Sequence, residues 1–103
     1  MKCYAIAMID FTDSGWIKDY VARVTPMVER LGGRYLARTN RVDRIEGEGP
    51  PPGTLLIIEF PSRQVAEGFY HSEEYAPFKA ARQRGSVGPF FLVDGIDGSA
   101  APA

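Results

Sequence analysis

Two strand-like segments that are apolar on both faces constrain the fold of this chain most. Successive side chains of a β-strand point to opposite faces of its sheet, so a strand with cover on one side alternates apolar and polar residues. In the segment Cys3–Ile9, both sets of alternate residues are apolar. The segment Leu55–Phe60 also has apolar residues on both faces, with Leu55 and Ile57 on one and Leu56, Ile58 and Phe60 on the other. Both segments therefore predict strands that are covered above and below.

The chain offers only two helical stretches to cover these strands. In the first, apolar residues recur at steps of three and four from Trp16 to Leu31, and the pair Gly32–Gly33 supplies a left-handed stop. Pro26 predicts a kink inside this helix, because proline has no backbone N–H to donate. Two helices fill only one face of a sheet. The other face needs a partner, and we expect a second copy of the chain, in a homodimer that packs sheet to sheet.

The remaining segments continue the order of strands and helices. Gly- and Pro-rich residues 47–53 predict a turn, while Ser62 and Ser72 are expected to cap two pieces of the second helical stretch. Pro77 is expected to split that stretch further before it ends at Gly85. The other expected elements are a second strand over 34–39 that continues irregularly through 42–46, a third strand over 54–60, and a fourth strand over 87–93.

This order, β-α-β-β-α-β, is that of the ferredoxin-like α+β fold. It predicts a four-stranded antiparallel sheet with helices on one face and with the first and third strands in the centre. These central strands are the two segments that are apolar on both faces, so local pattern and topology agree. We expect one domain over residues 1–95 and a disordered tail over 96–103, which is rich in Gly, Ala and Ser.

Composition narrows the function classes. The chain has 103 residues and a net charge of −1, which gives no electrostatic footprint for nucleic acid. Cys3 is the only cysteine and His71 the only histidine, so no intramolecular disulfide and no Cys/His metal cluster can form. The short apolar N-terminus predicts neither a signal peptide nor a membrane span. We therefore expect a soluble cytoplasmic protein with no metal, cofactor, nucleic acid or membrane partner.

Several motifs resemble the domain of unknown function 1330 family. They are Glu59-Phe60-Pro61-Ser62, Phe69-Tyr70-His71-Ser72-Glu73-Glu74-Tyr75, Leu31-Gly32-Gly33-Arg34-Tyr35 and Phe91-Leu92-Val93-Asp94-Gly95. The resemblance spans residues 2 to about 95. It implies membership of the dimeric α/β-barrel group, whose ferredoxin-like subunits pack sheet against sheet and which includes cofactor-free monooxygenases, lactone isomerases and haem-degrading or chlorite-decomposing enzymes. The resemblance implies a homodimer but no particular reaction.

Two carboxylates at strand ends form the first candidate site. Glu59 lies near the end of a strand expected to be covered on both faces, where a carboxylate needs a partner or a proton. If the central strands are parallel neighbours, Asp10 lies at the same edge of the sheet as Glu59. Pairing across the 47–53 turn is expected to bring the region Arg38–Arg41 near Glu59. The alternative interpretation is a structural ion pair, which is common without catalysis.

The second candidate site is the element Tyr70-His71-Ser72-x-x-Tyr75, with Arg82 downstream. Two phenols, an imidazole and a guanidinium could orient a small anionic or aromatic ligand, and histidine is the residue type suited to acid–base work near neutrality. Alternatively, Ser72 only caps a helix, Tyr70 and Tyr75 are core anchors, and His71 is solvated. Trp16, Tyr20 and Met27 are interpreted as core, and Cys3 as a small buried hydrophobe.

We therefore expect a homodimeric protein that binds a small anionic or aromatic molecule in the barrel. It is a candidate cofactor-free enzyme resembling the monooxygenases or isomerases of its group. The candidate catalytic residues are His71, Glu59 and Asp10, and the candidate ligand-binding residues are Arg38, Tyr70, Ser72, Tyr75 and Arg82. The alternative is a non-catalytic dimeric binding or structural module. RNA binding on the open sheet face ranks last, because the third strand lacks the glycine–aromatic signature that stacks bases.

Overall fold

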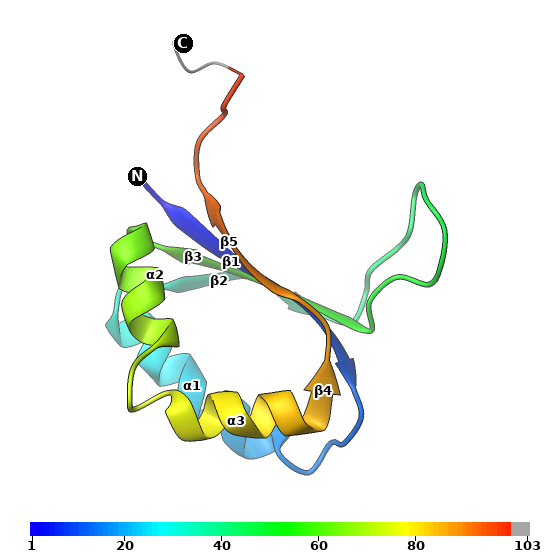
Figure 1. Ribbon diagram of the computed structural model, residues 1–103, viewed down its shortest axis with the longest axis horizontal. Helices are drawn as coiled ribbons and strands as arrows, with labels where there is room; N and C mark the ends of the chain where they lie inside the picture. The colour runs from blue at the N-terminus through cyan, green and yellow to red at the C-terminus, as the bar shows by residue number, and fades with distance from the viewer. Residues whose placement is uncertain (100–103) are drawn as a thin grey trace.

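The computed structural model describes residues 1–99 as an antiparallel sheet with helices on one face (Figure 1). Its elements, in chain order, are β1 (Cys3–Phe11), α1 (Ile17–Arg30), β2 (Arg34–Thr39), β3 (Thr54–Phe60), α2 (Arg63–Tyr70), α3 (Ala76–Gly85), β4 (Ser86–Val87) and β5 (Phe90–Asp94). The strands β1 and β3 are central, since β3 lies between β2 and β1, and β1 pairs on its other side with β5 and β4. The ferredoxin-like fold predicted from the sequence is confirmed.

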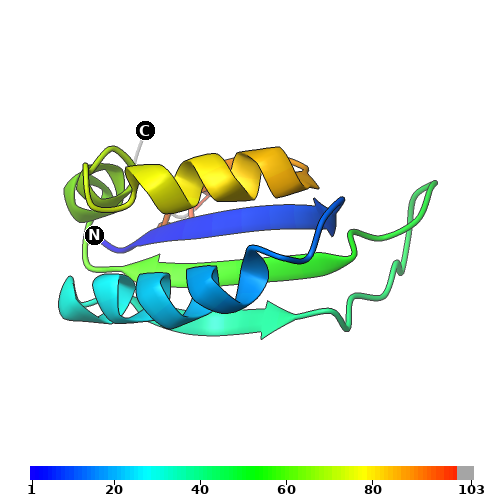
Figure 2. The same ribbon diagram turned by 90° about the horizontal axis from the view of Figure 1, so that it is seen from below.

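The core lies between the sheet and the helices. Alternate residues of β1 and β3 point into it, and most are less than a tenth exposed: Cys3, Ala5, Ala7 and Ile9 from β1, and Leu56, Ile58 and Phe60 from β3. From the helices, Val24 and Val28 of α1 and Phe69 of α2 pack against them. Figure 2 shows α1 and α3 lying across the same face of the sheet.

The opposite face of the sheet carries no helix (Figure 1). Its side chains are the other alternate residues of the central and edge strands, and many are apolar. Phe91 is 48% exposed, Val93 is 42% exposed and Met8 is 36% exposed. Ile6 pairs with both Ile57 and Phe91 across the strands, so these apolar side chains form one continuous surface.

The fourth strand differs from the prediction of a single strand over 87–93. It is divided into β4 and β5 by Gly88 and Pro89, and Gly88 has a φ of +132°. The Met8 N–H donates to the Pro89 carbonyl oxygen at 3.0 Å, which keeps the interruption bound to β1. The interruption lets the chain leave α3 and still join the edge of the sheet.

The helices agree with the sequence prediction at Gly32 and Ser62 and differ from it at Pro77. α1 runs without interruption through Pro26 and stops at Gly32, whose φ is +82° as the left-handed stop requires. Ser62 caps α2, because its Oγ accepts from the Val65 N–H at 3.1 Å. Pro77 does not split a helix: it lies in the first turn of α3, where proline needs no N–H partner.

The second strand ends at Thr39, so the predicted continuation through 42–46 is wrong. Residues 40–53 form a long connection that projects beyond the sheet (Figure 2). Of the tail predicted to be disordered, residues 100–103 lie outside the described residues, and 96–99 form neither helix nor strand. Within residues 1–99, no helix is both long and apolar enough to cross a membrane.

Candidate functional site

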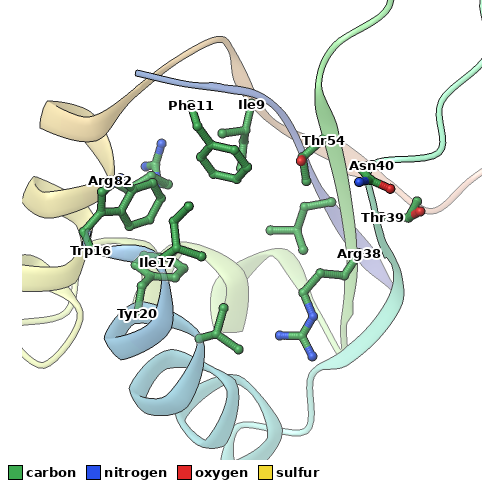
Figure 3. A pocket seen from close by; sticks show the side chains of 12 residues that line it. Ile9, Phe11, Trp16, Ile17, Tyr20, Arg38, Thr39, Asn40, Thr54 and Arg82 are labelled. Carbon is green, nitrogen blue, oxygen red and sulfur yellow. The ribbon is translucent and has the colours of Figure 1, made fainter. Parts of the chain in front are cut away.

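A pocket of about 430 Å³ lies between α1 and the sheet (Figure 3). This volume is within the range of small-molecule sites. Its walls are mainly apolar and aromatic, with a few polar side chains; they comprise Ile9, Phe11, Trp16, Ile17, Tyr20, Val21, Arg38, Thr39, Asn40, Thr54, Leu56 and Arg82. No carboxylate and no imidazole is among them, whereas two arginines are. The electrostatic character of the pocket is therefore positive.

Trp16 is fixed on one wall by the backbone of two other segments. Its indole Nε1 donates to the Asp13 carbonyl oxygen at 2.7 Å and to the Gly85 carbonyl oxygen at 3.2 Å. Gly85 has no side chain to obstruct this approach: a Cβ built there would lie 2.1 Å from Nε1. The end of α3 thus sets the position of the indole at the start of α1.

Arg82 lies on the same side of the pocket as Trp16 (Figure 3). It is only 7% exposed, and it has no ion-pair partner among the carboxylates of residues 1–99. Its Nε donates to the Tyr75 hydroxyl at 3.3 Å, but its buried Nη2 has no hydrogen-bond partner in the described chain. Burial lowers the pKa of Arg82, and the neighbouring tyrosines, Tyr75 first, raise it further than burial lowers it. The guanidinium therefore stays protonated.

Arg38 approaches the pocket from the opposite side, on β2 (Figure 3). A β-bulge between Tyr35 and Ala37 shifts the register, so Arg38 pairs with Leu56 and shares its helix-facing side of the sheet. The Arg38 guanidinium lies 3.9 Å from the centre of the Tyr35 ring, and its Nη1 donates to Thr25 Oγ1 at 2.7 Å. The prediction that the region Arg38–Arg41 lies near Glu59 is therefore wrong.

A buried pair of tyrosines connects the pocket to Arg82. The hydroxyl oxygens of Tyr20 and Tyr75 are 2.6 Å apart, and Tyr75 is fully buried. Burial raises the pKa of Tyr20 far above its ordinary value, and Tyr75 raises it further. Tyr20 lines the pocket, and its hydroxyl, directed at Tyr75, stays neutral throughout the physiological range.

The two strand-end carboxylates do not share a site. β1 and β3 are antiparallel, and Tyr4, at the start of β1, is the residue that pairs with Glu59. Asp10 is therefore at the other end of the sheet, and the prediction of one shared edge is wrong. Asp10 instead accepts from the Gly53 N–H at 2.8 Å and holds the end of the 40–53 connection.

Glu59 lies on the open face, where cations surround it. Its Oε1 is 3.5 Å from Arg34 Nη2 and 3.6 Å from Lys2 Nζ, and the Tyr4 hydroxyl donates to its Oε2 at 3.4 Å. Arg34 pairs with Glu59 across β2 and β3. The alternative interpretation of a structural ion pair fits this arrangement.

The tyrosine–histidine element lies mainly around a second, smaller hollow of about 250 Å³. This hollow is lined by Glu67, Tyr70, His71, Phe90 and Leu92. Tyr70 stacks near Phe90, and Lys79 Nζ lies 4.3 Å from the centre of the Tyr70 ring. His71 is exposed at the end of α2.

Ser72 and Tyr75 do not line this hollow. Ser72 Oγ donates to the Phe69 carbonyl oxygen at 2.8 Å and accepts from the Tyr75 N–H at 3.2 Å, so its bonds lie within the link between α2 and α3. Tyr75 faces Tyr20 and Arg82. The predicted constellation is thus divided between two places in the fold.

The sequence interpretation missed the aromatic wall of the larger pocket. Trp16 and Tyr20 were assigned to the core, but both are only half-buried and both line the pocket. Met27, assigned with them, is 8% exposed and belongs to the core. The available signal was position: shortly after the end of β1, Trp16 is the N-cap of α1 and Tyr20 lies in its first turn.

The arrangement can bind a small molecule with an apolar body and an anionic group. Among residues 1–99, no three His, Cys, Asp or Glu side chains gather in a way that could hold a metal ion. The charged donors among the lining residues are Arg38 and Arg82, and guanidinium groups match carboxylate, phenolate or enolate oxygens.

Known proteins place the chain in a family and a fold. The family model described as "Domain of unknown function (DUF1330)" matches residues 2–96. No curated protein matches the chain. Among solved structures, RPA0582 from Rhodopseudomonas palustris, a protein of unknown function, is 15% identical, with a TM-score of 0.75 over 93% of this chain and 83% of that one.

Two further solved structures share the fold at low identity. SnoaB, a cofactor-independent oxygenase from Streptomyces nogalater, is 11% identical, with a TM-score of 0.67 over 97% of this chain and 98% of that one. An antibiotic biosynthesis monooxygenase is 20% identical, with a TM-score of 0.51 over 94% of this chain and 100% of that one. At these identities the likeness shows the fold alone.

Proposed function

The chain belongs to the DUF1330 family, and we propose that it binds a small organic anion with an apolar or aromatic body in the pocket between α1 and the sheet. The observation that carries this proposal is Arg82. A buried guanidinium with no carboxylate partner in the described chain and an unpartnered Nη2 is costly for the folded protein. An anion bound in the pocket would supply the missing negative charge beside Arg82.

The shape and chemistry of the walls support the same ligand class. Trp16 and Phe11 offer aromatic surface, their ring centres lying 5.8 Å apart. Arg38 adds a second positive charge on the opposite side of the pocket. No acidic side chain lines the pocket to repel an anion.

Trp16 provides the test, because it is the only tryptophan of the chain and it lines the pocket. We expect 3-phenylpropanoate, which is transparent at the excitation wavelength of tryptophan, to change Trp16 emission saturably. Arg82→Gln should weaken this binding at least about tenfold, the scale of one charged hydrogen bond. Arg84→Gln is the matched control, since Arg84 is exposed on the same helix. A titration without saturation for 3-phenylpropanoate and for benzoate would contradict the proposal.

A second candidate function is oxygenation without a cofactor. SnoaB is described as a cofactor-independent oxygenase, and the positive charges of Arg38 and Arg82 could stabilise an enolate or phenolate in the pocket. Such an anion can itself reduce O₂, with one oxygen atom entering the product and the other leaving as water. Because no carboxylate or imidazole lines the pocket, the substrate would have to be acidic enough to ionise without a base from these walls. Oxygen uptake with phenolic and 1,3-diketone substrates, abolished in Arg82→Gln, would support this candidate.

We further propose that the open sheet face is the interface of a homodimer. In a single chain this face exposes the apolar side chains of Met8, Phe91 and Val93 together, and a contiguous exposed apolar surface is a mark of an interaction site. A second copy presents the same surface, so the two faces complement each other about a two-fold axis. If neither anion binding nor oxygen uptake is found, a non-catalytic dimeric module is the remaining function.

A further inference from the structure

The 40–53 connection is braced by its own atoms. Arg44 joins its two limbs, because its Nη1 donates to the Glu46 carbonyl oxygen at 3.2 Å and its Nη2 to the Pro50 carbonyl oxygen at 3.1 Å. Gly47 turns the chain between these limbs with a φ of +98°, and three consecutive prolines restrict the backbone that follows. The connection therefore has little conformational freedom left to lose in a contact.

This connection holds Ile45 in solvent. Ile45 is 88% exposed, more than any other large apolar side chain of residues 1–99. Figure 1 shows that the connection rises on the side of the sheet opposite the helices, which is the side of the open face. An exposed apolar side chain on a braced segment, beside an apolar sheet face, marks an interaction site.

The connection and the far end of the open face carry opposite charges. Residues 40–53 contain three acidic and two basic side chains, a net charge of −1. Within residues 1–99, none of these three carboxylates forms an ion pair. The connection meets β3 at the first residue of that strand, whereas Glu59 lies near the last, flanked by Lys2 and Arg34. These three side chains give that end of the sheet a net charge of +1.

The direction of the two-fold axis decides which surfaces of two copies meet. An axis along the strands would bring the two connections together, negative against negative. An axis that crosses the strands in the plane between the sheets turns the second copy end for end, so the connection of each copy faces the Lys2 end of the other. Opposite charges then meet twice, once at each end of the interface. Electrostatic complementarity therefore favours the second arrangement.

We infer that residues 40–53 are an arm that packs against a second copy of the chain, whose strands run antiparallel to those of the first across the open faces. Ile45 contacts the apolar surface of the second copy beside its Val93, which is 42% exposed and pairs with Tyr4 at the Lys2 end. The acidic side chains of the arm face Lys2 and Arg34 of the second copy. This inference rests on the proposed homodimer and adds its orientation. Both halves of the contact are present on one chain, so the partner is a second copy.

The first experiment measures the dimer dissociation constant of the full chain by sedimentation at low ionic strength. Ile45→Asp should raise this constant at least about tenfold, because a carboxylate replaces an apolar anchor in both symmetric contacts. Leu31→Asp is the matched control, since Leu31 is also an exposed apolar residue but lies in the helix layer. Its dissociation constant should equal that of the wild type.

The second experiment tests the orientation by exchanging charges. Glu46→Lys reverses the net charge of the arm, and Lys2→Glu reverses that of the end it faces. Each change alone should weaken the dimer about threefold or more, because attraction becomes repulsion in two contacts. The two changes together in one chain should restore the dissociation constant to within about twofold of the wild type. High salt should reduce all these differences.

Each outcome decides one part of the inference. A wild-type dimer that Ile45→Asp does not weaken would overturn the arm and leave the proposed dimer intact. Single charge variants that dimerise as the wild type does, or a double variant without rescue, would overturn the antiparallel orientation. If the wild type is a monomer, both the inference and the proposed dimer fail. Ile45 lies outside every helix and strand, so its variant decides the matter even if a charge variant does not fold.

Discussion

Arg82 shows how one residue can carry information about a ligand. In most folded proteins a buried guanidinium is paired with a carboxylate, because its desolvation is otherwise uncompensated. Here its neighbours are the Tyr75 hydroxyl and the Phe90 ring, whose centre lies 5.3 Å from the guanidinium carbon. These contacts engage part of the guanidinium, but Nη2 has no hydrogen-bond partner in the described chain. Such an arrangement lowers the stability of the folded protein, and it is typical of sites whose residues serve binding.

The sequence grouped Arg82 with Tyr75, whose hydroxyl does accept from Arg82 Nε at 3.3 Å, but it gave no sign of the link through Tyr75 to Tyr20. Arg82 was grouped with His71 because both lie in the same stretch of chain. The structure instead links Arg82 to Tyr20, which lies 62 residues earlier in the chain. A long-range contact of this kind depends on how α1 and α3 pack, and no local pattern encodes it.

Tyr20 also predicts a dependence of stability on alkaline pH. Its pKa is raised in the folded protein by burial, so above pH 10 the unfolded chain releases its proton before the folded protein does. The stabilising contribution is complete below pH 10 and is lost as the pH rises beyond it. We expect the free energy of unfolding, measured in urea, to fall above pH 10 with a slope that Tyr20→Phe reduces by up to about 1.4 kcal/mol per pH unit. Between pH 7 and 9 the slopes of the two proteins should agree, and identical slopes above pH 10 would contradict the assignment.

At the scale of elements, periodicity predicted the helices and central strands well. β1 and β3 are where their apolar runs lie, and α1 ends at Gly32 as its left-handed stop requires. The errors arose where the backbone departs from regular pairing. The bulge beside Leu36 moves Arg38 to the helix-facing side of the sheet, whereas strict alternation would leave it on the same face as Arg34. Alternation alone cannot reveal an inserted residue.

The interruption at Gly88 is the second such departure. Its φ of +132° is open to glycine, and a Cβ there would lie 1.9 Å from the Met8 carbonyl oxygen on the neighbouring strand. We expect Gly88→Ala to lower the free energy of unfolding by at least about 2 kcal/mol, since backbone strain and a steric clash add.

Gly68→Ala is the control for Gly88→Ala, with an effect of opposite sign. Gly68 lies inside α2, and a Cβ there meets nothing within 4 Å. This change should stabilise the protein by about 0.5–1 kcal/mol, because alanine has the higher helix propensity. Urea unfolding of both variants measures the contrast, and a Gly88→Ala protein as stable as the wild type would show that the strand is not tied to Met8.

At the scale of the whole molecule, the sheet separates two surfaces with different roles. The helix-facing side contains the core and the pocket that Trp16 and Arg82 line, whereas the open side carries apolar residues and the Glu59 ion pairs. The double-sided apolar pattern of β1 predicted that both faces need cover, and the helices cover only one (Figure 1). The pocket therefore does not need the open face to form, and binding and assembly can be tested separately.

Phe91→Lys tests the assembly. Phe91 is 48% exposed in the single chain and lies on the edge strand β5, where it pairs with Ile6 of the central strand β1 on the open face. In a sheet-to-sheet dimer the second copy would cover this side chain, and a lysine there would be desolvated without a partner. We expect the wild-type protein to sediment as a dimer at about 10 µM, because an interface of standard size keeps two copies associated at concentrations of this order. We expect Phe91→Lys to sediment as a monomer at the same concentration.

The matched control is Leu31→Lys, which places the same charge on a 40% exposed apolar residue at the end of α1, in the helix layer. It should sediment as the wild type does. A well-folded wild-type monomer at this concentration would contradict the dimer, whereas a Phe91→Lys dimer would move the interface to another surface. Because Phe91 does not line the pocket between α1 and the sheet, the monomeric variant should still bind 3-phenylpropanoate with the affinity of the wild type. A loss of binding in the monomer would instead show that the second copy completes the site.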